Sequence, residues 1–74
     1  MFKWLIKEPP TVGSIWVLRG EENNPFTDTY KVQVVEIKKG WVKYTWVWAI
    51  GLDRFYGDYL SIRGFRAIYR ETKT

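Results

Sequence analysis

The chain has 74 residues, a formal net charge of +4, and neither cysteine nor histidine. These properties exclude a second domain, a disulfide, the Ser-His and Cys-His catalytic arrangements and the usual zinc sites. Five Trp, five Tyr and four Phe remain. Since each ring can bury about 150–250 Å², they can supply the dense core that so short a chain needs.

The basic residues are concentrated in the second part of the chain. Residues 1–30 hold three basic and four acidic residues, whereas residues 31–74 hold nine basic and four acidic ones. This excess favours an acidic partner, either a protein surface or a nucleic acid, although a merely solubilising surface would have the same composition. No apolar run approaches the ~20 residues of a membrane span, and a chain without cysteine suits the cytosol. We therefore expect a soluble, unprocessed cytosolic protein without a membrane partner.

Residues 1–11 predict a short arm, because the apolar stretch FKWLI ends at Pro9-Pro10, which can continue neither a helix nor a sheet ladder. The following VGSIWVLRG predicts a strand that is apolar on both faces and therefore covered on both. Next, GEENNPFTDT has the composition of an irregular loop. Its Asn24-Pro25-Phe26 is a tripeptide that some endocytic adaptor domains bind, but we favour a turn whose Phe fills part of the core.

The stretch YKVQVVEIKKG predicts a strand with a bulge or a bend. Its apolar residues alternate up to Val34 and then shift by one, to Val35 and Ile37. Because such a shift sends every later side chain to the other face, a bulge near Val34–Val35 is needed to restore the pattern. The KKG that follows predicts a tight hairpin turn, with Gly40 at a position of positive φ.

GWVKYTWVWAI predicts one long strand over residues 41–50, in which Val42, Tyr44, Trp46, Trp48 and Ile50 share the core face. A turn at 51–53 and a strand over 54–60, interrupted by Gly57-Asp58, follow. Ser61 is expected to cap a single helical turn that Phe65 anchors to the core, and residues 67–70 form the last strand. Five strands with one helical turn before the last predict an all-β, SH3-like barrel over residues 12–70, with a polar tail at 71–74.

The segments VGSIWVL, VQVVEIKKGWVKY and SIRGFRAIY resemble small SH3-like proteins encoded by bacteriophages. The resemblance covers roughly residues 12–70 and rests on short, mostly structural motifs. It implies the barrel fold and a viral origin, and hence an accessory or anti-defence protein that acts in the host cytosol. It implies no particular activity. The arm and the aromatic residues 45–50 depart from the shared pattern.

The sequence offers little for catalysis. Glu21/Glu22 and Asp53/Asp58 are the possible carboxylate pairs, but both fall in predicted turns or loops, where the burial that perturbs a carboxylate is not expected. The glycines are scattered one per turn, so no phosphate-binding loop is present. We expect no enzyme activity, no cofactor and no metal site.

Binding through a basic-aromatic surface is the better hypothesis. The predicted partner-binding residues are Trp41 and Lys43 on the outer face of the long strand, Arg54 and Tyr56 on the next strand, and Arg63 and Arg66 at the rim. Trp, Tyr and Arg dominate protein–protein hot spots, so we favour a protein that binds and occludes a host macromolecule. Three alternatives stay open: binding of single-stranded DNA or RNA by the same residues, a homo-oligomer, and coverage of Trp41 and Tyr56 by the Pro9–Pro10 arm.

Overall fold

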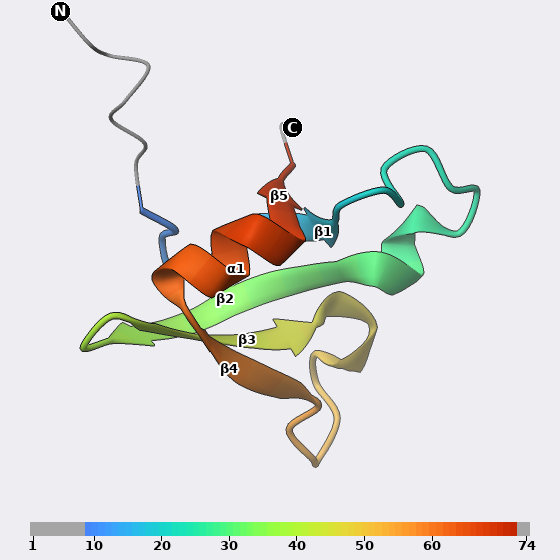
Figure 1. The fold of residues 1–74 in the computed structure, drawn as a ribbon. Helices are drawn as coiled ribbons and strands as arrows, with labels where there is room; N and C mark the ends of the chain where they lie inside the picture. The colour runs from blue at the N-terminus through green and yellow to red at the C-terminus, as the bar shows by residue number, and fades with distance from the viewer. Residues whose placement is uncertain (1–8, 73–74) are drawn as a thin grey trace, which may run out of the picture.

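The computed structural model describes residues 9–72 (Figure 1). These residues form five strands, one α-helix and two 3-10 turns. The elements in chain order are β1 (Ile15–Leu18), η2 (Thr27–Tyr30), β2 (Lys31–Lys38), β3 (Trp41–Trp46), η3 (Val47–Ala49), β4 (Gly57–Ser61), α1 (Ile62–Ile68) and β5 (Tyr69–Glu71). Most of the predicted arm lies outside the described residues. Among those residues, no helix is long and apolar enough to cross a membrane.

The five strands form one antiparallel sheet in the order β4-β3-β2-β1-β5, and α1 lies against one of its faces (Figure 1). The predicted mostly-β class, with five strands and a helical segment before the last, is confirmed. The helix has seven residues rather than a single turn. The sheet is not closed into a barrel, because within residues 9–72 its two edge strands, β4 and β5, do not pair. The hydrogen bonding between β1 and the last strand extends to Thr72, whose amide donates to the Ile15 carbonyl.

The core lies between α1 and the sheet and is built around Phe65. The Phe65 ring is fully buried and meets the rings of Trp16, Tyr44 and Tyr69 at centroid distances of 5.0, 5.3 and 5.0 Å. Val32, Val34 and Val42 complete the cluster. As predicted, Phe65 anchors the helix and Ser61 caps it, since the Ser61 Oγ accepts a hydrogen bond from the Gly64 amide at 3.0 Å.

Two backbone features predicted from the pattern in β2 are present. The β2–β3 register shifts between Val34 and Glu36, which leaves Val35 as the extra residue of a bulge. At the hairpin, Lys39 and Gly40 both have positive φ, 51° and 82°. Two consecutive central residues of this kind make the type I′ turn that matches the twist of the flanking strands. The strand β1 is also covered on both faces as expected, because Trp16 and Val17 are both buried.

The prediction of one long strand over residues 41–50 is wrong for residues 47–50. β3 ends at Trp46, and residues 47–49 form the turn η3, which buries Ala49 instead of Trp48. Trp48 and Ile50, both assigned to the core, are 54% and 52% exposed. The chain stops pairing at Trp46, so the strand alternation no longer decides which side chains face inward.

The predicted strand over residues 54–60 begins later than expected. β4 starts at Gly57, and residues 50–56 form an exposed loop. The favoured interpretation of Asn24-Pro25-Phe26 is also wrong in part. These residues do form a turn, but the Phe26 side chain is 72% exposed and fills no part of the core.

Candidate functional site: an aromatic surface around Lys43

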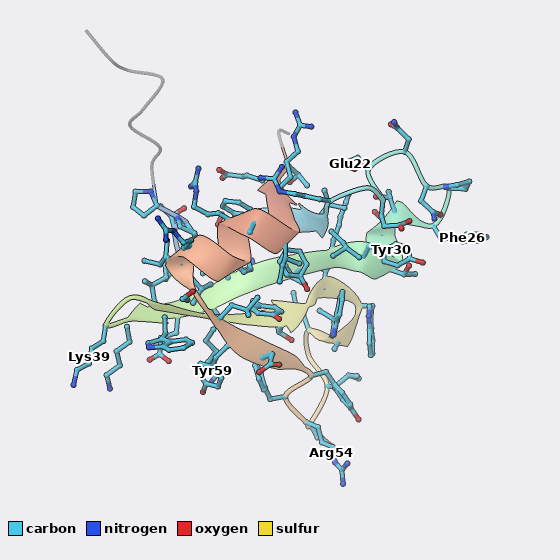
Figure 2. All side chains as sticks on the ribbon, in the orientation of Figure 1. Glu22, Phe26, Tyr30, Lys39, Arg54 and Tyr59 are labelled. Carbon is cyan, nitrogen blue, oxygen red and sulfur yellow. The ribbon has the colours of Figure 1, made fainter. Side chains whose placement is uncertain are left out.

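The outer face of the β2–β3–β4 sheet carries the candidate site. Because side chains alternate along a strand, the burial of Val42 and Tyr44 on the α1 side sends Trp41 and Lys43 to the opposite side. The register pairs Lys43 with Tyr59 of β4 and with Glu36 of β2. Tyr59 points away from α1 (Figure 2). The hairpin turn and the bulge therefore set which side chains of β3 face outward.

Lys43 is the centre of this surface. Its Nζ lies 4.9 Å from the ring centroid of Phe55 and 5.7 Å from that of Tyr59, both within the range of cation–π attraction. Within residues 9–72, no carboxylate forms an ion pair with Lys43. These contacts favour the position of the ammonium group beside the two rings.

Three large rings next to Lys43 remain about half exposed: Trp41 at 54%, Tyr59 at 52% and Phe55 at 49%. We call Trp41, Lys43, Phe55 and Tyr59 the outer patch. Part of it opens into a groove of about 380 Å³, lined by Glu36, Lys38, Lys39, Trp41, Lys43 and Tyr59. We call this the lysine groove. Three cations and one carboxylate give it a positive character.

A second groove, which has aliphatic side chains in its lining, continues the surface beyond Phe55. It has a volume of about 320 Å³ and is formed by the outer face of β2 and β3 and by the loop after η3. Val35, the bulge residue, and Ile50 and Leu52 of the loop are exposed there. The bulge thus turns an aliphatic side chain outward and extends the apolar area beside the outer patch.

Of the predicted partner-binding residues, the structure brings Trp41 and Lys43 together and places Arg54 and Tyr56 elsewhere. Arg54 lies in the exposed loop and lines the second groove. Tyr56 packs on Trp48 with ring centroids 5.7 Å apart, and its carbonyl accepts hydrogen bonds from the Trp46 amide and the Thr45 hydroxyl. Lys43 therefore meets Tyr59 rather than Tyr56.

Arg63 and Arg66 do not form a rim around the outer patch, because they lie on α1, across the sheet from it. Arg63 is exposed. The guanidinium of Arg66 lies 5.9 Å from the ring centroid of Trp16, and its carbonyl accepts two hydrogen bonds from Arg19. These contacts tie α1 to the start of the 20–30 loop. Trp41 and Tyr56 are 54% and 39% exposed, and most of the arm that was an alternative cover for them lies outside the described residues.

Neither Phe55 nor Tyr59 was among the residues predicted from the sequence. Tyr59 could have been found by placing Leu60 on the core face of β4, because the alternation then puts residues 57, 59 and 61 on the outer face. Phe55 belongs to a loop, and its contact with Lys43 follows from the path of the backbone, which no periodicity encodes.

The titratable groups of residues 9–72 with shifted pKa values lie in the core and in the segment after β1. Burial raises the pKa of Tyr44 and of Tyr69, whose hydroxyls are hydrogen-bonded to each other in the core. Backbone hydrogen bonds, including one from the Gly20 amide, lower the pKa of Glu22. Among residues 9–72, no three acidic side chains lie close enough together to hold a metal ion.

No protein-family model, curated protein or solved structure matches this chain.

Proposed function

We propose that this chain is a small non-enzymatic binding protein that covers part of a host macromolecule with its outer patch. The observation that carries the proposal is the half-exposure of Trp41, Phe55 and Tyr59 around one lysine. Large apolar patches on small soluble proteins usually mark interaction sites, and Trp and Tyr are enriched at the centres of protein interfaces.

The favoured partner is a protein with an acidic and apolar surface. Val35, Ile50 and Leu52 extend the exposed area with aliphatic side chains, which an apolar protein surface can cover. A partner carboxylate on Lys43 would form an ion pair that residues 9–72 do not supply. Occlusion needs no chemistry, in keeping with the accessory or anti-defence role that the resemblance to phage proteins implies. The strand order, the bulge in β2 and the helix before β5 support an SH3-like assignment.

A second candidate function is binding of single-stranded nucleic acid. The lysine groove favours it, because Lys38, Lys39 and Lys43 surround the exposed rings of Trp41 and Tyr59. Phosphates attracted by lysines and bases stacked on rings are the usual means of binding single strands, and stacking contributes about 1–3 kcal/mol per base.

A capture experiment separates the two candidates. Tagged protein is exposed to host bacterial lysate with and without nuclease, at low and at moderate salt. The favoured function predicts one protein recovered in stoichiometric amount despite nuclease and salt. Recovery of only nuclease-sensitive, salt-labile material would instead establish the second candidate, because nucleic-acid affinity falls steeply with salt. A labelled oligo(dT) measured by fluorescence anisotropy provides the direct check of that outcome.

A further inference from the structure

The Phe26 side chain projects from a well-ordered turn. The Phe26 amide donates to Asn24 Oδ1 at 2.7 Å, and the Thr27 amide donates to the Asn24 carbonyl at 2.9 Å. The Phe26 carbonyl in turn accepts from both the amide and the hydroxyl of Thr29. We call this segment the Phe26 turn. These bonds hold the backbone from which a 72% exposed ring projects, so burying the ring against a partner would require no ordering of that backbone.

The lysine groove has room for such a ring. Its volume of about 380 Å³ exceeds the ~150 Å³ of an engineered apolar cavity in another protein that binds benzene. Its walls carry the half-exposed rings of Trp41 and Tyr59. Aromatic pairs add attraction beyond the area that they bury.

The charges of the two features are complementary. Residues 20–30 contain Glu21, Glu22 and Asp28 and no basic residue. Lys31 and Arg70 pair with Asp28 and Glu22, but the Asp28 side chain remains 85% exposed, so its pair with Lys31 is a weak surface contact that a groove lysine can replace. The groove offers Lys38, Lys39 and Lys43 against Glu36. Phe26 and Lys39 lie at opposite sides of the molecule (Figure 2). A second copy of the chain can therefore present its Phe26 turn to a groove that the first copy leaves open.

We propose that the chain associates head to tail, with the Phe26 turn of one copy seated in the lysine groove of the next. Each added copy leaves one turn and one groove free, so the contact is heterologous and builds a ring or an open row instead of a closed symmetric pair. The contact does not depend on the proposed function. Since it uses the same groove, self-association and partner binding would compete.

Sedimentation velocity of the purified protein tests this proposal over about 10 µM to 1 mM, where weak contacts become populated. We expect species larger than a dimer at the upper end. Phe26→Ala and Lys43→Glu should each weaken association about tenfold or more, since central aromatic and charged groups dominate such contacts. Val12→Ala, which shortens another exposed apolar side chain, is the matched control and should leave it unchanged. Circular dichroism establishes that each variant is folded.

Mixing the two defective variants gives a sharper result. Phe26→Ala keeps an intact groove and Lys43→Glu keeps an intact turn, so the mixture should form a one-to-one dimer that grows no further. A wild-type protein that stays monomeric throughout would overturn the proposal, as would a dimer that Phe26→Ala leaves unchanged. The capture experiment tests partner binding independently of self-association, because Phe26→Ala should still capture a host partner while it no longer self-associates.

Discussion

At the scale of single residues, Gly57 shows how closely the start of β4 approaches β3. A Cβ built at this position would clash with the carbonyl oxygen of Tyr44. It would also lie only 2.8 Å from both Thr45 Cα and Phe55 Cζ. Two of these atoms belong to the backbone of a central strand, which cannot move without disturbing its other pairings. Glycine is therefore required where the register that joins Lys43 to Tyr59 begins.

We accordingly expect Gly57→Ala to lower the free energy of unfolding by about 1–3 kcal/mol or more, the range for overpacked sites. Tyr59→Ala is the control in the same strand. Since that side chain is half exposed, its loss should cost no more than about 1 kcal/mol, the upper end for a cross-strand pair. Urea denaturation followed by circular dichroism compares the two. Equal midpoints for Gly57→Ala and the wild type would show that the strand accommodates the methyl group.

Burial of the Tyr44 and Tyr69 hydroxyls predicts sensitivity to alkali. Burial raises the pKa of both above the ordinary value of 10.0, so the unfolded chain loses these protons before the folded chain does. The resulting stabilisation is complete below pH 10 and is lost as the pH rises above it, by up to about 1.4 kcal/mol per pH unit for each tyrosine. Urea midpoints at pH 8 to 11 measure the loss. The urea midpoint of Tyr44→Phe should fall less steeply with pH than that of the wild type. The midpoint of Tyr56→Phe, which alters an exposed tyrosine, should fall as steeply as that of the wild type. Superimposable profiles for all three would contradict this account.

At the scale of elements, sequence patterns correctly predicted the features that a few neighbouring residues determine, namely a bulge and a hairpin turn. The one-residue phase change placed the bulge at Val35, and KKG placed a turn with Gly40 at positive φ. The end of β3 could not be predicted in the same way. No glycine or proline interrupts the alternation before Gly51, so the turn η3 is imposed by tertiary contacts, which override strand propensity. The same limit hid Phe55 and the start of β4 from a sequence-based reading of the site.

The end of β3 separates two tryptophans that the alternation would treat alike. Trp46 packs against the core cluster, whereas Trp48 lies outside it and touches Tyr56. We expect Trp46→Ala to lower the free energy of unfolding by about 2–3 kcal/mol, somewhat less than a fully buried Trp would cost. Trp48→Ala should cost about 1 kcal/mol or less. Urea denaturation of both variants measures the difference, and equal losses would mean that the strand alternation continues past Trp46.

At the scale of the whole molecule, the class and the strand count were predicted correctly from the sequence, whereas the closed barrel that was also predicted is not present in the sheet of residues 9–72. Closure depends on how far the edge strands β4 and β5 curve toward each other. That curvature is the sum of the small twists between all neighbouring strands, which no local pattern in the sequence determines. Within residues 9–72, the outer faces of β2, β3 and β4 lie beside an exposed loop, and these faces carry the outer patch. Trp41 and Lys43 were predictable because one strand's alternation places both, whereas Tyr59 depended on the register between two strands.

If the outer patch is the surface through which this chain binds, variants in the patch should lose the partner while variants elsewhere should keep it. The captured amount of a nuclease- and salt-resistant host protein is measured for the wild type, for Trp41→Ala/Lys43→Gln and for Arg63→Gln. Trp41 and Lys43 lie in the patch, while Arg63 lies across the sheet on α1. The account predicts at least a tenfold loss of capture for the patch variant, since central anchors carry most of an interface's energy, and none for Arg63→Gln. Undiminished capture by a folded patch variant, or loss with Arg63→Gln alone, would contradict it.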